Sequence, residues 1–183
     1  MMYSLRAFVF AALFLTWVAA IYDVRTGRIP NWLTTLGMIL ALGAHAALAF
    51  GAGGGAFALH ACENTALGAA VCALIPFLLW WGGLAGGGDV KLIAVVGAFC
   101  HASIGMESVF CAFALGTAFI VLKLAWEGHL FAMLISGLTS LANMVLPKSR
   151  RIAVRAPAMA TMKFGPAMAA GMALTTIAHG VLS

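Results

Sequence analysis

Long runs of apolar residues, separated by short polar or glycine-rich segments, dominate the chain. These runs lack the strict alternation of β-strands and predict α-helices. About 20 helical residues are needed to cross a hydrocarbon core of about 30 Å. The expected spans cover residues 5–22, 32–50, 65–81, 89–101, 106–126 and 165–182. The pattern therefore predicts an all-α, polytopic membrane protein with about six transmembrane helices in a single domain, residues 1–183.

Glycine, proline and asparagine mark the expected breaks between these spans. Gly51–Gly55 predicts a flexible turn, and the loop that follows is expected to extend to Glu63. Asp23–Asn31 is expected to form the first loop. The next helix can start with Pro30 at its first position or with Asn31 as its cap, because both residue types favour helix N-termini.

Two segments leave an alternative open. In 130–146, Ser136, Ser140 and Asn143 recur at helical spacing and form one polar stripe. This favours an amphipathic helix in the membrane interface, and the alternative is a seventh crossing. The first run follows Arg6, so a secretory signal peptide is the alternative to a signal-anchor helix; the further spans favour the anchor.

The composition excludes a soluble domain of this length. Hydrophobic residues make up 64% and charged residues 8% of the chain, whereas soluble proteins are about a quarter charged. The net charge of +5 is spread over the loops, which predicts contacts with membrane lipids and no binding of nucleic acid. The four cysteines form no Cys-x-x-Cys pair and are interpreted as small apolar residues, not as metal ligands or disulfide partners.

The distribution of basic residues predicts an orientation. Six spans place every Lys and Arg except Arg6 on one side of the membrane. Basic loops stay in the cytoplasm, so that side is expected to be cytoplasmic, with both termini facing outward. Asp23 ends the first span on this side, and two further spans bring Asp89 back to it. The two carboxyl groups are therefore expected at similar depth on the cytoplasmic face.

A pair of carboxyl groups can hydrolyse a peptide bond without a metal or another cofactor, and neither is expected here. Two carboxyls a few ångströms apart share a proton, so one can activate water while the other polarises the carbonyl. The pair titrates as a unit, and neither role is assigned to Asp23 or Asp89. Gly86 and Gly88 lack a Cβ and would allow an extended substrate strand to approach.

Simpler interpretations compete with this one. Asp89 could cap the fourth helix, and Asp23 could end the first in a polar loop. Lys91 is interpreted as a snorkelling residue or a charge partner of Asp89, not as a catalyst. A transporter or proton-conducting subunit could use the same acids, although they lie at one face and no broken span has a counterpart. A structural subunit of a secretion complex is a third possibility.

Three motifs, in this order, resemble those of the type IV prepilin peptidases. They are Asp23-x-Arg25 with Ile29-Pro30-Asn31, Gly86-x-Gly88-Asp89-x-Lys91-Leu92 with Gly97-Ala98, and Phe164-Gly165-Pro166 leading into Ala169-Ala170-Gly171. The resemblance covers nearly the whole chain. It implies an aspartic endopeptidase of the bacterial cytoplasmic (inner) membrane that cuts prepilins and pseudopilins on the cytoplasmic side, after the glycine of a short basic leader.

The resemblance assigns the two catalytic aspartates to Asp23 and Asp89. Their neighbours are candidates for binding substrate or shaping the site: Arg25, Pro30, Asn31, Gly86, Gly88 and Lys91. The expected partners are prepilin or pseudopilin substrates and membrane lipids, and contacts with pilus or secretion machinery are expected to be indirect. Close approach of substrate is expected at Gly83 and Gly86–Gly88, and the helix that bears Asp89 is expected to move when substrate binds.

The chain also departs from the longer members of that family. Those carry a cytoplasmic insert with paired Cys-x-x-Cys motifs and also N-methylate the new terminus. This sequence has no such insert, so it resembles the short form associated with tight-adherence (Flp) pili, and methyltransferase activity is not expected. Lys163 stands where many relatives have proline.

Overall fold

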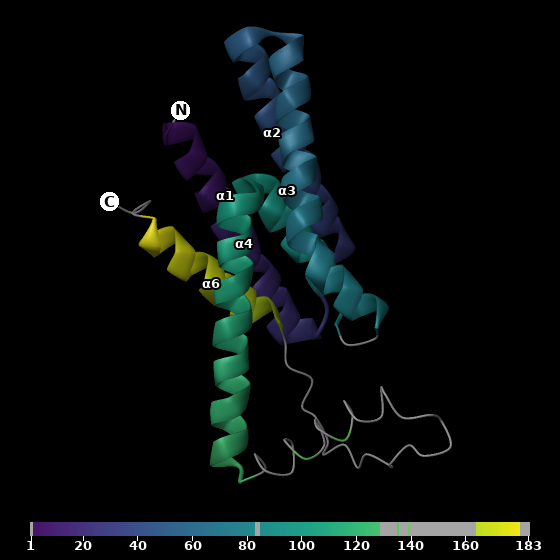
Figure 1. Ribbon diagram of the computed structural model, residues 1–183, viewed down its shortest axis with the longest axis vertical. Helices are drawn as coiled ribbons and strands as arrows, with labels where there is room; N and C mark the ends of the chain where they lie inside the picture. Colours follow the sequence, from purple (N-terminus) through teal and green to yellow (C-terminus); the bar gives the residue numbers. More distant parts are fainter. Residues whose placement is uncertain (1, 83–84, 129–134, 136–138, 140–163, 180–183) are drawn as a thin grey trace. The chain divides into compact units, whose positions relative to one another are not determined.

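The computed structural model describes residues 2–82, 85–128, 135, 139 and 164–179. Five helices are labelled in Figure 1: α1 (Met2–Thr26), α2 (Asn31–Gly53), α3 (Gly55–Trp81), α4 (Gly87–Trp126) and α6 (Phe164–Ala178). Apart from 135 and 139, the helix predicted at 130–146 lies outside the described residues, as do Gly83 and Lys163.

The chain divides into two compact units. One comprises residues 1–115 and 163–183, and the other residues 116–162. In the second unit the described part is mainly the C-terminal portion of α4, where Lys123 and Glu127 form an ion pair with an N–O distance of 3.9 Å. The single domain predicted from the sequence stays a prediction.

The all-α membrane architecture is confirmed. Four helices are long and apolar enough to cross a membrane by length and composition: Arg6–Thr26, Asn31–Gly53, Gly55–Trp81 and Gly87–Trp126. α6 is a shorter apolar helix. Large apolar side chains such as Phe14 (72% exposed) and Ile39 (62% exposed) lie on the surface. An exposed apolar surface of this kind suits contact with lipid.

α4 contains a break that the hydropathy pattern predicted. His101 has φ 58° and ψ 179°, which is not helical, so the element consists of two helical segments, 87–100 and 102–126. The first segment rises only about 21 Å, less than a hydrocarbon core of about 30 Å. Gly105 returns close to Gly97: a Cβ built on Gly105 would lie 3.1 Å from the Gly97 Cα. The chain therefore folds back at His101.

The predicted loop between the second and third spans is wrong. α2 continues to Gly53 and α3 begins at Gly55, so Gly54, with φ 79°, is the whole turn. Glycine in a helix interior costs about 1 kcal/mol. In lipid an unpaired backbone group costs several kcal/mol, so the helices extend through their glycines.

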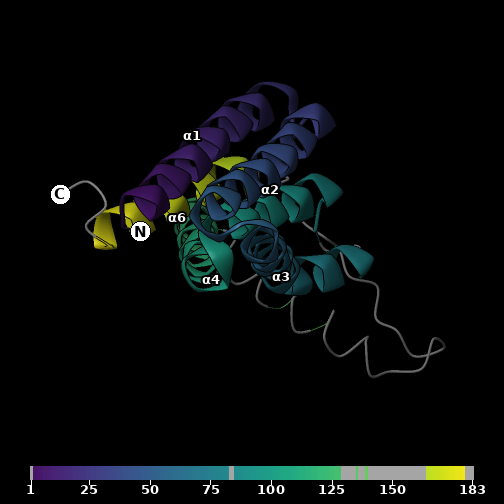
Figure 2. The same ribbon diagram turned by 90° about the horizontal axis from the view of Figure 1, so that it is seen from above.

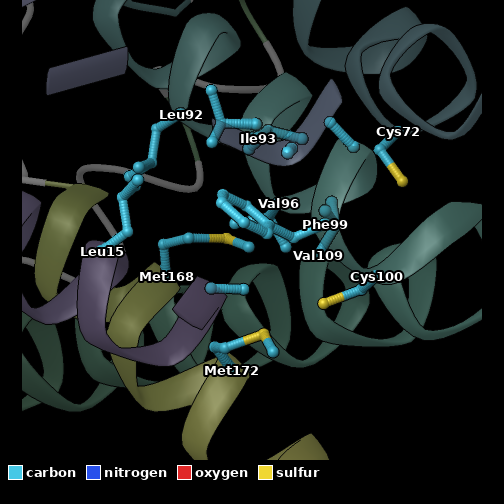
Figure 3. Close-up of a cluster of buried hydrophobic side chains, with 14 of the residues drawn as sticks. Leu15, Cys72, Leu92, Ile93, Val96, Phe99, Cys100, Val109, Met168 and Met172 are labelled. Carbon is cyan, nitrogen blue, oxygen red and sulfur yellow. The ribbon is translucent and has the colours of Figure 1, made fainter. Parts of the chain in front are cut away.

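The first segment of α4 forms the centre of the larger unit. Figure 3 shows its apolar side chains between those of α1, α3 and α6. Leu92, Ile93 and Val96 are completely buried, and Met168 and Met172 of α6 belong to the same buried cluster. Around this segment α1 packs along α6, and α2 pairs with α3 (Figures 1 and 2). Asp89 thus begins the best-packed segment of the unit.

Small residues bring these helices together. A Cβ on Gly97 would lie 2.8 Å from the Cys72 Cβ of α3, and one on Gly171 would lie 2.5 Å from the Ala112 backbone nitrogen. Close packing over small residues is the main source of helix association in lipid, where apolar burial gives little net gain. Cys72 and Cys100 lie in this core, and all four cysteines are free thiols.

Candidate active site

Asp23 lies in the last turn of α1. The Gly27 N–H donates to the Asp23 carbonyl oxygen at 2.9 Å, and Gly27 has φ 67°. This is the left-handed C-terminal motif in which glycine ends a helix. The helix therefore includes the first four residues of the predicted loop, Asp23 to Thr26. Asp23 is only 6% exposed, so a buried acid stands at the negative end of the α1 dipole, where an acid is destabilising.

The N-terminus of α6 offsets this destabilisation. The Gly165 N–H donates to the Asp23 Oδ2 at 2.9 Å. A Cβ on Gly165 would lie 2.9 Å from the Asp23 Cβ and 3.1 Å from the Ala20 Cα. Only glycine allows the first turn of α6 to approach α1 this closely. The positive end of α6 is thus directed at a buried carboxyl group.

Asp89 lies in the first turn of α4 and is half-buried. Its carboxyl group lies beside the glycine turn, since a Cβ on Gly86 would lie 3.0 Å from the Asp89 Oδ2. The Asp89 N–H donates to the Gly86 carbonyl oxygen at 3.1 Å. An acid in the first turn complements the positive end of the helix dipole. The position of Asp89 therefore also suits the simpler interpretation, in which it stabilises the start of α4.

The two acids lie at the same end of the larger unit. The Asp23 carboxyl acts electrostatically on the Asp89 carboxyl, although the residues come from separate helices. Asp23 is in addition held by α6 through Gly165. Three helices that are distant in sequence thus converge on this pair of carboxyl groups. The two acids thus lie near each other, as counting spans predicted; their catalytic role and the side of the membrane on which they lie stay predictions.

The glycines before Asp89 contact the protein's own side chains. A Cβ on Gly87 would lie 3.2 Å from the Trp80 Nε1, and one on Gly88 would lie 3.3 Å from the Ile29 Cβ. Ile29 belongs to the short connection between α1 and α2. Gly86 is exposed. The glycines therefore let the start of α4 pack against this connection and the end of α3; whether substrate also approaches there stays a prediction.

Pro30 and Asn31 do not take either of the predicted positions. Pro30 precedes the helix in an extended conformation (φ −66°, ψ 135°), and Asn31 is the first helical residue of α2 without a capping bond from its side chain. The Asn31 Oδ1 instead accepts a hydrogen bond from the Lys91 Nζ at 2.9 Å. Asn31 and Lys91 were both candidate site residues from the sequence, but the sequence did not predict the hydrogen bond between them.

The remaining candidate lies at the surface. Arg25 is exposed in the last turn of α1, where a basic side chain complements the helix dipole. Among the described residues, no group of three or more His, Cys, Asp or Glu side chains is arranged to hold a metal ion. The sequence analysis assigned no role to Gly165. It identified the motif Phe164-Gly165-Pro166 but could not predict that the Gly165 amide bonds Asp23.

Fold and site together define a class: a multi-pass helical membrane protein in which acidic side chains of two helices meet near one end of the bundle. The particular family follows from comparison. The model of the type IV leader peptidase family, peptidase A24, matches residues 9–121. This is more than half of the chain and includes Asp23 and Asp89. The chain therefore belongs to the type IV leader peptidase family.

Membership establishes the kind of enzyme. The protein is a prepilin leader peptidase of the aspartic type, in a bacterial family of multi-pass membrane proteins. The matched region ends before Phe164-Gly165-Pro166, so the third motif lies outside it. Comparisons with curated proteins and with solved structures gave no match.

Proposed function

We propose that Asp23 and Asp89 form the catalytic pair that removes the leader from prepilin or pseudopilin precursors. The observation that carries the proposal is the placement of the two acids: the backbone at Gly88, next to Asp89, packs on Ile29 in the connection that follows Asp23, and the carboxyls are near enough to interact electrostatically. A buried acid at the negative end of a helix lowers stability. Asp23 occupies such a position, which supports a role in function over a role in folding.

The reaction needs one carboxylate and one carboxylic acid. The carboxylate takes a proton from a bound water while the water oxygen forms a bond to the scissile carbonyl carbon. The carboxylic acid donates its proton to the carbonyl oxygen. The C–N bond then breaks, the leaving nitrogen receives a proton from the pair, and the products are the leader carboxylic acid and a new N-terminal amine. As the carbonyl group re-forms, a hydroxyl of the tetrahedral intermediate returns its proton to the pair, which thus regains its single shared proton.

The substrate side follows from charge. Arg25, Arg28 and Lys91 are exposed near the acid pair, and basic segments remain in the cytoplasm. We therefore assign the site to the cytoplasmic face, where the substrate's apolar helix would dock among the spans. We also assign the chain to the short, tight-adherence (Flp) form, without N-methyltransferase activity, because the sequence lacks the insert with paired Cys-x-x-Cys motifs.

Loss of either carboxylate tests the pair. The chain is co-expressed with a candidate prepilin, and leader removal is followed by gel shift. Asp23→Asn and Asp89→Asn should each abolish cleavage, because the shared proton and the base are lost together. Membrane insertion and thermal unfolding in detergent should stay close to those of the unchanged chain.

Two controls make the outcome decisive. Glu127→Gln removes an acid of the second unit and should leave processing intact. Normal processing by either aspartate variant would exclude the pair as the catalytic centre. The alternative of a proton-conducting subunit predicts proton uptake by vesicles that contain the protein; uptake that depends on Asp23 and Asp89, without any cleavage, would favour it.

A further inference from the structure

The hydrogen bond between Lys91 and Asn31 joins two parts of the chain that carry the two acids. Asn31 begins α2, just after the connection that follows Asp23. Lys91 lies two residues after Asp89 in α4. The bond from the Lys91 Nζ to the Asn31 Oδ1 is 2.9 Å long, and both residues are exposed. A bond at this place limits how far the start of α4 can move from the end of α1.

A second contact supports this bond. Gly88 packs on Ile29, so the backbone beside Asp89 rests on the connection between α1 and α2. Gly27 on the other side of that connection fixes the end of α1 through its bond to the Asp23 carbonyl oxygen. The end of α1, the connection between α1 and α2, and the start of α4 are therefore each fixed to the next by packing or a hydrogen bond. The Lys91–Asn31 bond is the hydrogen bond between side chains in this set, and it lies at the surface.

We propose that Lys91 and Asn31 are positioning residues that hold Asp89 at its working distance from Asp23. The proposal rests on the role assigned above to the two acids. An exposed polar pair contributes little to stability, so the function of the bond is geometric. A displacement of about 1 Å in a catalytic group can reduce a rate about a hundredfold. Lys91 acts on the reaction through Asp89, without a requirement to contact the substrate.

The alternative role for Lys91 is direct binding of substrate, and kinetics distinguishes the two. The full-length enzyme in detergent is assayed with a purified prepilin whose basic leader ends in glycine. Lys91→Met and Asn31→Leu should each lower kcat by about ten- to a hundredfold with little change in KM. The double variant should be no slower than the slower single variant, because both remove the same bond. Lys91→Arg should restore most of the activity.

Several outcomes would overturn the proposal. They are an unchanged kcat in Lys91→Met or Asn31→Leu, a loss confined to KM, multiplied losses in the double variant, or unfolding of either single variant. Lys123→Met, which removes an exposed lysine of the second unit, is the matched control and should leave kcat unchanged. Failure here is separable from failure of the acid pair: if Asp23→Asn and Asp89→Asn are inactive but Lys91→Met is normal, only the positioning role is lost.

Discussion

The two acidic residues have opposite relations to their own helices. Asp89 lies in the first turn of α4, at the positive end of the helix dipole, where an acid stabilises the helix. Asp23 lies buried at the negative end of α1, where a negative charge is unfavourable by about 0.3–1 kcal/mol. Replacement of Asp23 should therefore harm activity far more than stability. This asymmetry supports a functional role for Asp23. The hydrogen bond from the Gly165 amide partly offsets the cost of burying an acid at this end of α1.

His101 gives a prediction at the level of one residue. Its φ of 58° and ψ of 179° lie in a region that is populated almost entirely by glycine, at a cost of about 1–3 kcal/mol for other residues. Both His101→Gly and His101→Ala lose the ring that faces His45 (centroids 4.6 Å apart). Only the glycine variant also removes the conformational strain of the backbone at this position.

The two His101 variants should therefore differ in stability. His101→Gly should be more stable than His101→Ala by about 1–3 kcal/mol, as measured by thermal unfolding in the same detergent. Equal stability of the two variants would show that the backbone at the turn in α4 is not strained.

At the level of elements, the start of α6 is a component of the site. A Cβ on Gly165 would collide with the Asp23 Cβ and with α1 backbone, so Gly165→Ala should push α6 away and weaken the bond to the Asp23 Oδ2. Cleavage should fall by about ten- to a hundredfold. Leader removal per folded molecule is the measurement.

Gly171→Ala is the matched control, because it also disturbs α6, but against Ala112 of α4. It should lower the unfolding temperature and leave more activity per folded molecule than Gly165→Ala does. The same activity loss in both variants would indicate that general packing of α6, and not its contact with Asp23, is what matters.

The elements also show what the sequence could reveal. Hydropathy predicted the helices and the break near His101, and counting spans placed Asp23 and Asp89 at the same end of the bundle; the catalytic role that the motifs assign to them stays a prediction. The turn at Gly54 was placed wrongly, because local glycine preference indicates a loop where the membrane environment enforces helix. The bonds of Gly165 and of Lys91 could not be predicted, since each depends on how helices distant in sequence approach one another.

At the level of the whole molecule, the orientation in the membrane links structure to substrate. α2 and α3 are each long enough to cross the membrane and are joined at Gly54. The connection between α1 and α2 and the glycine turn before α4 should therefore share one face. No Lys or Arg lies between 29 and 90, so the Gly54 turn is without basic residues. The positive-inside rule then predicts that the Gly54 turn lies outside and that the acid pair lies on the cytoplasmic side.

Cysteine labelling tests this orientation directly. Thr26→Cys, Ala52→Cys and Ala85→Cys are made one at a time in a chain whose four native cysteines are replaced by alanine, and a membrane-impermeant maleimide is added to spheroplasts. Ala52→Cys should be labelled in intact spheroplasts, and Thr26→Cys and Ala85→Cys only after permeabilisation. Leader cleavage by each variant controls for folding. Labelling of Thr26→Cys and Ala85→Cys from opposite faces would separate the two acids across the membrane and exclude a shared site. Labelling of both Thr26→Cys and Ala85→Cys in intact spheroplasts would leave the two acids together but on the outer face. A leader that stays in the cytoplasm could not reach a site there, so this result would exclude the proposed orientation.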